Sequence, residues 1–377
     1  MRKVSPVWLI VLSVMLVFGF AEGQKIKTVD GVTVVSNGKK PNRVEGQPSR
    51  FVLKEEQSIG GGADPDKSLS QVSTFAVDDE GTVFALDFKD QKVKVYDRTG
   101  KFLRSIGKPG QGPGELGMAS GIQLIGNDTL VIEDATNRRL AQFKPTGEFI
   151  KNVATSGMLG LVGVLYDDKG NVLGREMGLA EDNSKMFFEI KKFDPDLKPL
   201  FILDKIEFPV PVPGSGAKMN ILDLISVYQF GPGGNIYYGR NARYDIKVYG
   251  PEGKHIRTIQ KDYDSVKVTQ KDIDEMLERI PNVAGGVNIK DMFAFPDVFP
   301  PFQNFLLDDQ GRIFVRTYTK GKAKGEYVID VFDPEGRFIA QFITKSNLVL
   351  FKGSKAYGIE ESDEGYQTIK RYAVSTD

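Results

Sequence analysis

The stretch VKVYDRTGKFLRSIGKPGQGPGEL, from Val93 to Leu116, decides the fold of this chain. Its β-branched and aromatic residues predict a strand up to Tyr96, a turn at Asp97-Arg98-Thr99-Gly100 and a returning strand from Lys101 to Ile106. The same pattern recurs as QFKPTGEFIKNV, KFDPDLKPLFIL, VYGPEGKHIRTI and VFDPEGRFIAQF, which begin at Gln142, Lys192, Val248 and Val331. Such repetition predicts an array of similar units.

Another strand-turn-strand pattern opens each unit. It occurs six times, beginning at Phe75, Ile122, Val164, Tyr228, Phe305 and Leu348. Five of these six openings are followed by the hairpin described above, whereas the sixth has only YQTIKRYAVS after it, which leaves a fourth strand missing. The strand FVLKEEQSIG from Phe51 can fill that vacancy.

We therefore predict an all-β fold: a six-bladed β-propeller of four-stranded antiparallel blades over residues 51–377, closed by its N-terminal strand. Ring closure leaves only short, protected sheet edges. The alternative, an open solenoid, would need terminal repeats with polar outer faces, and neither end supplies one.

From about Phe51 to the C-terminus the chain is similar to a known repeat, most clearly in the first two blades. The segment DDEGTVFALDFKDQKVKVYDRTGKFLRSIGKPGQGPGEL, from Asp78 to Leu116, resembles the NHL-type repeat of six-bladed β-propellers in the TolB-like/NHL-like superfamily, and especially exported bacterial members with a GxxGxGPGE segment. The Asn-His-Leu tripeptide is replaced by Asp90-Gln91-Lys92 and Asn137-Arg138-Arg139. The resemblance implies the fold and not an activity.

Composition and the first residues concern location and partners. Lys plus Arg and Asp plus Glu each number 50, so the net charge is zero, which argues against nucleic acid as a partner. Arg2 and Lys3 precede an apolar run from Val7 to Phe20, which is shorter than the ~20 residues of a membrane span. We expect residues 1–23 to be a signal peptide, the mature chain to begin at Gln24 without a membrane span, and the protein to be periplasmic or extracellular.

Two segments interrupt or precede the repeats. Residues 24–50 are polar and rich in turns after one or two short strands, and they predict a surface strap. An insertion at 261–303 follows the fourth blade. In it Thr269 can cap the run TQKDIDEMLERI, which it begins and whose apolar residues have helical spacing up to Pro281. Other long loops, at 177–185, 208–226 and 318–325, belong to the same face, which favours a binding role for that face.

The insertion also concentrates aromatic residues. The stretch DMFAFPDVFPPFQNF from Asp291 contains phenylalanines at Phe293, Phe295, Phe299, Phe302 and Phe305. One interpretation is that these rings pack on the propeller, because large aromatic side chains are usually buried. The other is that Phe293, Phe295, Phe299 and Phe302 form a partner-binding surface, because exposed aromatic clusters mark interfaces.

Charged residues recur at the end of the second strand of each unit. They are Asp87, Asp134, Glu176, Arg240, Arg316 (before Thr317) and Glu360. We expect this set to surround the mouth of the central channel and to favour a ligand or a cation. The alternative is that each side chain caps its own turn.

The catalytic candidates are few. The only histidine is His255, on an outer strand, and there is no cysteine and no G-x-S-x-G segment. No cofactor is expected, although Asp87, Asp134 and Glu176 offer the oxygen ligands that calcium prefers. The main hypothesis is an exported, non-catalytic propeller that binds a protein, peptide or glycan on the insertion face. The alternatives are a divalent-cation-dependent, lactonase-like hydrolase with an acidic site at the channel, and a structural component of a surface assembly.

Overall fold

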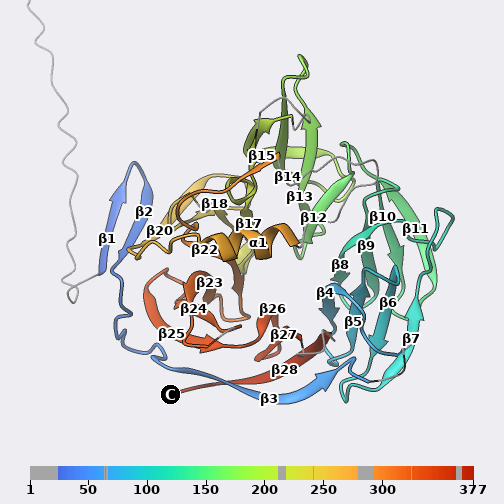
Figure 1. The fold of residues 1–377 in the computed structure, drawn as a ribbon, viewed down its shortest axis with the longest axis horizontal. Coiled ribbons are helices and arrows are strands. Elements are labelled where there is room, and N and C mark those ends of the chain that lie inside the picture. The colour runs from blue at the N-terminus through green and yellow to red at the C-terminus, as the bar shows by residue number, and fades with distance from the viewer. Residues whose placement is uncertain are drawn as a thin grey trace, which may run out of the picture.

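The protein forms a closed ring of six blades, as predicted (Figure 1). This computed structural model describes residues 24–62, 64, 67–210, 218–240, 242–278, 292–323, 325–361 and 367–377. The predicted signal peptide lies outside the described residues. The first strand of each blade contacts the first strands of its two neighbours, so these strands surround the axis of the ring.

Each blade is a sheet of four antiparallel strands, ordered from the axis outward. The first three blades consist of β4 (Val72–Val77), β5 (Val83–Asp87), β6 (Lys92–Tyr96) and β7 (Phe102–Ile106); β8 (Ala119–Ile125), β9 (Thr129–Asp134), β10 (Arg139–Phe143) and β11 (Phe149–Ala154); and β12 (Leu161–Tyr166), β13 (Val172–Leu179), β14 (Lys185–Phe193) and β15 (Pro199–Pro209). Blades 4 and 5 consist of β17 (Ser226–Phe230), β18 (Ile236–Arg240), β19 (Asp245–Tyr249) and β20 (His255–Lys261); and β22 (Phe302–Leu307), β23 (Ile313–Lys320), β24 (Tyr327–Phe332) and β25 (Phe338–Thr344).

The sixth blade closes the ring in the predicted way. It consists of β26 (Asn347–Lys352), β27 (Lys355–Glu361), β28 (Gln367–Thr376) and the N-terminal strand β3 (Phe51–Ile59). Strand β3 pairs antiparallel with β28 from Phe51 opposite Thr376 to Ile59 opposite Ile369. The open solenoid is therefore excluded.

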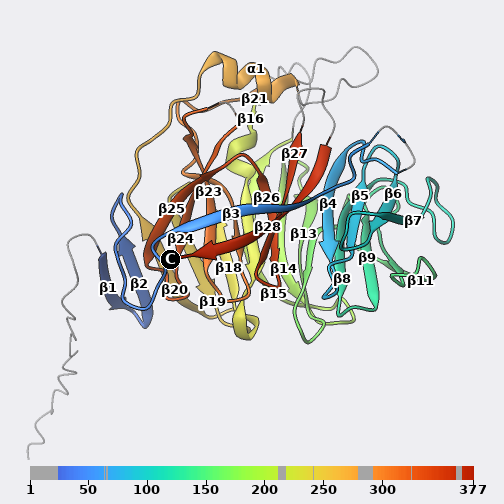
Figure 2. The same ribbon diagram turned by 90° about the horizontal axis from the view of Figure 1, so that it is seen from below.

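The strap folds into a hairpin on the outside of blade 4 (Figures 1 and 2). Strands β1 (Gln24–Val29) and β2 (Val32–Asn37) pair with each other, and β2 lies parallel to β20. The buried Asn37 amide donates to the carbonyl groups of Gln260 in blade 4 and Gly336 in blade 5, both at 3.0 Å. Its Oδ1 accepts hydrogen bonds from the backbone N–H of Phe338 and from the side chain of Gln24. This single side chain therefore joins two blades to the hairpin.

The tight turns of the repeats share one hydrogen-bond pattern. In the β6–β7 turn, Asp97 Oδ1 accepts the backbone N–H of Thr99 at 2.9 Å and of Lys101 at 3.0 Å, and Gly100 has a positive φ of 82°. That left-handed backbone explains the glycine. The degenerate copy KFDPDLKPLFIL places Leu197 there, with a φ of 60°.

The core is divided among the interfaces between blades. Between blades 1 and 2, for example, Val93 and Ile106 belong to one cluster with Ile132 and Phe143. Strands such as β5, in which every residue is buried, contribute side chains to the interfaces on both sides of their sheet. Packing between neighbouring blades thus supplies the apolar burial that stabilises the ring.

The insertion crosses the face that carries the long loops (Figures 1 and 2). Its helix α1 (Gln270–Glu278) begins after Thr269, whose hydroxyl and backbone N–H both donate to Asp272, so the predicted helix and its cap are confirmed. Strand β21 (Phe293–Ala294) pairs parallel with β16 (Met219–Asn220), which joins the insertion to the loop between blades 3 and 4. No helix among the described residues is long and apolar enough to cross a membrane.

Candidate binding site on the insertion face

The predicted ring residues do occupy equivalent places in the first four blades. Asp87, Asp134, Glu176 and Arg240 each lie opposite the first residue of their blade's first strand. In blade 5 that place belongs to Thr317, one residue after Arg316, and Glu360 lies one residue beyond the equivalent place in blade 6. The alignment made from sequence is therefore structurally sound in most blades.

Asp134 is an internal link of blade 2. Its side chain is fully buried, and Oδ1 accepts the backbone N–H groups of Gly117 at 3.0 Å and Met118 at 3.2 Å. Oδ2 accepts hydrogen bonds from the Asn137 amide at 2.7 Å and from Arg139 Nε at 3.0 Å. The carboxylate thus holds the loop that leads into the blade as well as its own turn.

Asp87 has the same role in blade 1. It is fully buried, accepts the backbone N–H groups of Ser70 at 2.7 Å and Gln71 at 3.2 Å, and forms an ion pair with Lys94 at 3.3 Å. Asp87 and Asp134 expose no surface, so neither carboxylate is accessible to a ligand in the channel. Their carboxylates satisfy buried backbone N–H groups, which would otherwise be costly.

The other ring residues also have partners, with one exception. Glu176 forms an ion pair with Lys191 at 2.7 Å, Arg316 donates to the Asn347 side chain in the next blade, and Glu360 accepts the Tyr372 hydroxyl. Burial raises the pKa of Glu176, but the hydrogen bonds from Lys191 and Ser156 and the charge of Lys191 together outweigh burial, so the pKa is lowered. These three residues are half-buried.

Arg240 is the exception. Its side chain is exposed at the end of β18, and no hydrogen bond or ion pair joins its guanidinium to any residue that the structure describes. An arginine carries five donors and a permanent charge. Arg240 is therefore the ring residue best suited to contact a ligand.

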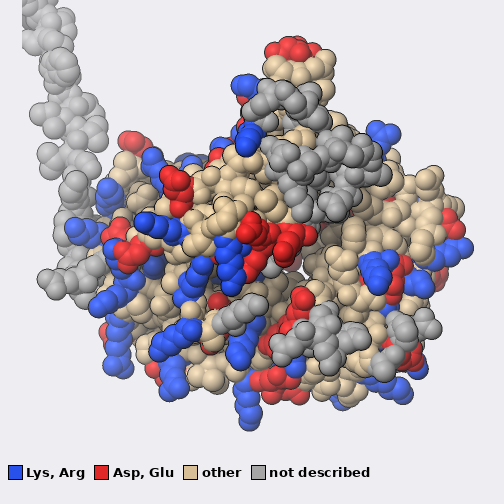
Figure 3. All heavy atoms as spheres, viewed as in Figure 1, with Lys and Arg blue, Asp and Glu red and all other residues tan. Residues whose placement is uncertain are grey.

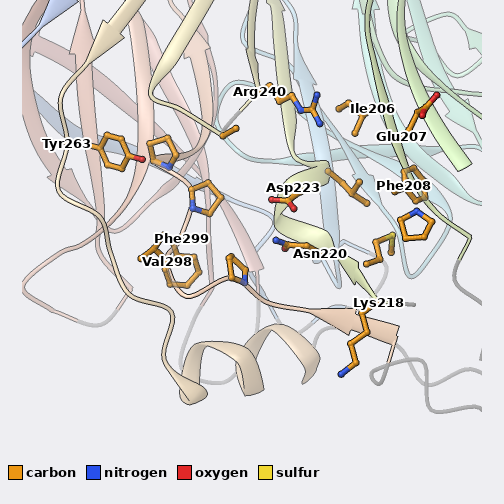
Figure 4. Close-up of a pocket in the computed structure, with 17 residues that line it drawn as sticks. Ile206, Glu207, Phe208, Lys218, Asn220, Asp223, Arg240, Tyr263, Val298 and Phe299 are labelled. Atoms are coloured by element: carbon orange, nitrogen blue, oxygen red, sulfur yellow. The ribbon is translucent and has the colours of Figure 1, made fainter. Parts of the chain in front are cut away.

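Arg240 opens onto a cavity of about 590 Å³ on the insertion face (Figure 4). The cavity lies where the end of β15, the loop between blades 3 and 4, and the insertion meet. Its apolar walls include Phe208, Pro209, Leu224, Pro296, Val298 and Phe299. A volume of this size lies within the range of about 300–1,000 Å³ that is typical of small-ligand sites.

The other charged groups around this cavity differ in availability. Glu207 forms ion pairs with Lys185 at 3.3 Å and Lys205 at 3.4 Å. Asp223, on the short 3-10 helix η1 (Ile221–Leu224), is exposed and has no such partner among the described residues. Lys218 points away from the other labelled side chains (Figure 4). One cation, Arg240, and one carboxylate, Asp223, therefore remain available in the cavity.

The predicted phenylalanines divide into two groups. Phe302 and Phe305 are completely buried in the core between blades 4 and 5, so Phe302 offers no surface to a partner. Phe299 is 8% exposed, stacks on Tyr318 with ring centroids 4.5 Å apart, and lines the cavity. Phe293 and Phe295 are half-buried. The packing interpretation thus holds for Phe302, and only the other three can contribute to a surface.

A second cavity, of about 580 Å³, lies at the axis and contains two charges that the sequence analysis missed. Glu133 accepts the backbone N–H groups of Gly163 at 2.9 Å and Val164 at 2.6 Å, where the ladder between β12 and β13 is interrupted. Arg175 donates to the backbone carbonyl of Ser226 at 3.0 Å. Each reaches the first strand of the next blade.

Both residues precede a predicted ring residue by one position. Glu133 precedes Asp134, and Arg175 precedes Glu176. Since successive residues of a strand point to opposite faces of the sheet, Glu133 reaches the next blade, whereas Asp134 binds the loop before its own blade. Burial raises the pKa of Glu133, although its backbone hydrogen bonds oppose this shift.

The described side chains were searched for groups that could bind a metal ion. No group of three or more His, Asp or Glu residues suited to a metal ion occurs within the described ranges. His255 lies on the outer strand β20, where its Nε2 is 2.9 Å from both the Arg257 carbonyl and the Thr258 hydroxyl. On the insertion face, acidic side chains gather over α1 beside the central hollow (Figure 3), and the exposed acids of α1 are Asp274, Glu275 and Glu278. These acids alone do not form a chelating group.

Comparison with known proteins supports the fold. A family model described as 6-bladed beta-propeller matches residues 65–159. No curated protein matches the chain. The narrower NHL label does not follow from this match.

Two solved structures extend the likeness to most of the chain. One is a candidate exported protein from Bacteroides fragilis NCTC 9343, with 13% identity, a TM-score of 0.56, and coverage of 91% of this chain and 99% of the other. The second, a member of the DUF4221 family from Bacteroides vulgatus, has 12% identity, a TM-score of 0.53 and coverage of 88% and 100%. At these identities the likeness concerns the fold, and the chain is a six-bladed β-propeller.

Proposed function

We propose that this protein is an exported, non-catalytic propeller that binds a protein, peptide or glycan partner on its insertion face. The observation that carries the proposal is the cavity of about 590 Å³ at Arg240, which is lined by the end of β15 and two inter-blade loops; Arg240 has no ion-pair partner among the described residues. Loops held by a rigid scaffold are where binding residues concentrate. The signal-like residues 1–23 and the likeness to a candidate exported protein support export.

The ring carboxylates favour binding over catalysis. Asp87 and Asp134 are fully buried and bonded to backbone N–H groups, so they are committed to the fold. A general acid or base must reach the proton it transfers. On this proposal the ligand is therefore bound and released unchanged.

Peptide and glycan arrays, probed with the chain from Gln24 onward, test the proposal. Ala242→Trp places a bulky ring at the cavity, because Ala242 is an exposed lining residue. Glu80→Trp is the matched control, since Glu80 is exposed on the opposite, tight-turn face. We expect Ala242→Trp to abolish binding and Glu80→Trp to retain it. Equal binding by both variants would place the partner elsewhere.

A further inference from the structure

We propose that the cavity on the insertion face recognises a carboxylate group, which Arg240 binds through its guanidinium. This inference rests on the proposed function and names the chemistry of the ligand. It concerns a small organic acid, or the acidic end of a larger ligand, with an apolar portion.

The first support is the difference between Arg240 and its equivalents. The ring residues Asp134 and Glu176 are each neutralised by a cation of their own blade, at 3.0 Å and 2.7 Å. Arg240 has no carboxylate partner within the part of the chain that the structure describes. The nearby Asp204 is bonded to the Tyr238 hydroxyl. Arg240 is thus a cation without a counterion among the described residues, and it lines the cavity on the insertion face.

The second support is the shape of the donor and of its surroundings. A guanidinium presents a planar fork that matches a carboxylate with two parallel hydrogen bonds. Ile206 lines the cavity beside Arg240, Phe208 lines it farther along β15, and Phe299 lines it from the insertion (Figure 4). Apolar walls exclude water, which strengthens a charged hydrogen bond. They also provide contact area for an apolar part of the ligand.

Asp223 restricts the anion to a single charge. Its carboxylate lines the same cavity, so a doubly charged phosphate would be repelled more strongly than a carboxylate. Asp223 can instead accept a hydrogen bond from a hydroxyl or amine of the ligand. The pair Arg240 and Asp223 therefore favours a carboxylate that carries a donor group. Peptide ends and sugar acids both provide this chemistry.

Matched acid and amide probes test the inference. N-acetylphenylalanine is compared with N-acetylphenylalaninamide, and glucuronate with glucuronamide, by calorimetry or ligand-observed NMR on the chain from Gln24 onward. We expect at least one acid to bind about tenfold more tightly than its amide, as the loss of a charged hydrogen bond implies. The pair that shows the preference distinguishes a peptide end from a sugar acid. Inorganic phosphate is expected to bind more weakly than that acid.

Variants assign the preference to Arg240. Arg240→Gln should remove the preference for the acid, and Arg240→Lys should retain part of it, because a lysine keeps the charge and loses the fork. Arg98→Ala is the matched control, since Arg98 is an exposed arginine in the tight turn between β6 and β7 on the opposite face. This control should bind as the wild type does.

The outcomes separate the inference from the proposed function. If acids and amides bind equally, or if neither acid binds at millimolar concentration, the inference is overturned. The array experiment with Ala242→Trp decides the proposed function independently, because it does not depend on the charge of the partner. If the array experiment shows binding at the insertion face but Arg240→Gln binds the acid probe as tightly as the wild type, the face binds a partner and Arg240 does not recognise a carboxylate.

Discussion

Blades 2 and 4 use the same structural position in opposite ways. In blade 2 the second strand ends at Asp134, which is buried and bonded to four groups, while the outer strand β11 is largely exposed. In blade 4 the second strand ends at Arg240, which is exposed and unpaired among the described residues, while the outer strand β20 is covered by the hairpin β1–β2. The two blades are therefore stabilised at different places. Blade 2 is held by side-chain hydrogen bonds at the end of its second strand, whereas blade 4 is held by the hairpin on its outer strand, which leaves Arg240 able to face a ligand.

The largest expected difference in stability is between alanine variants of the two equivalent residues, Asp134 and Arg240. Asp134→Ala leaves Arg139 without its buried ion-pair partner and two backbone N–H groups unsatisfied, so we expect a loss of about 3–5 kcal/mol in the free energy of unfolding. Arg240→Ala should change it by less than about 0.5 kcal/mol, because Arg240 is exposed. Urea denaturation measures both. Similar losses in the two variants would break the comparison.

A second test concerns the support of blade 4 from outside. Asn37→Ala removes hydrogen bonds to Gln260, Gly336 and Phe338 and leaves buried groups unpaired, which should cost about 2–3 kcal/mol. The matched control is Asn152→Ala, at an exposed position of β11 in blade 2, where we expect a change below about 0.5 kcal/mol. Unfolding in urea again provides the measurement. If Asn37→Ala were as mild as its control, the hairpin would not support blade 4.

A third, smaller effect depends on pH and lies next to Asp134. Burial raises the folded-state pKa of Glu133 above its ordinary value of 4.5. The protonated form is thus favoured by folding, so this contribution to stability is complete at low pH and is lost as the pH rises above 4.5 and through the raised pKa. The wild type should therefore lose stability relative to Glu133→Gln with rising pH, by about 1.4 kcal/mol for each unit of the shift.

Unfolding of both proteins between about pH 4 and pH 8 measures this difference. Glu148→Gln is a suitable control, because Glu148 is exposed in the turn before β11. A stability difference between wild type and Glu133→Gln that does not vary with pH would show that the Glu133 carboxyl titrates normally.

The last prediction concerns calcium, which we expect to have no effect on stability. Asp134 already accepts hydrogen bonds from backbone, Asn137 and Arg139, so its carboxylate is not free for calcium. We expect the midpoint of thermal unfolding to be the same with calcium and with a chelator. A bound ion at a hundred times its dissociation constant would add about 2.7 kcal/mol, which a thermal scan detects easily. A calcium-dependent rise of the midpoint in the wild type that is absent in Asp134→Asn would favour the lactonase-like alternative.

The repeating pattern of the chain was sufficient to predict the ring. Strand, turn and strand signals are local, because alternation, Asp-x-x-Gly turns and helix caps depend on neighbouring residues. The number of blades, the closing strand from Phe51 and the helix after Thr269 therefore followed from the residues themselves. The face that carries the insertions followed from the order of the loops.

The roles of individual side chains depended on contacts between distant segments. Asp134 and Arg240 occupy equivalent positions, yet only Asp134 meets a loop whose backbone N–H groups need an acceptor. Phe302 and Phe293 occur in one aromatic stretch, but only Phe302 lies in a blade interface. The parallel pairing of β2 with β20 likewise joins residues more than two hundred positions apart, from Val34 to Thr258. Burial and pairing of this kind arise only when the blades pack together, so the tertiary structure alone decided which charged residues stabilise the ring and which one faces the cavity.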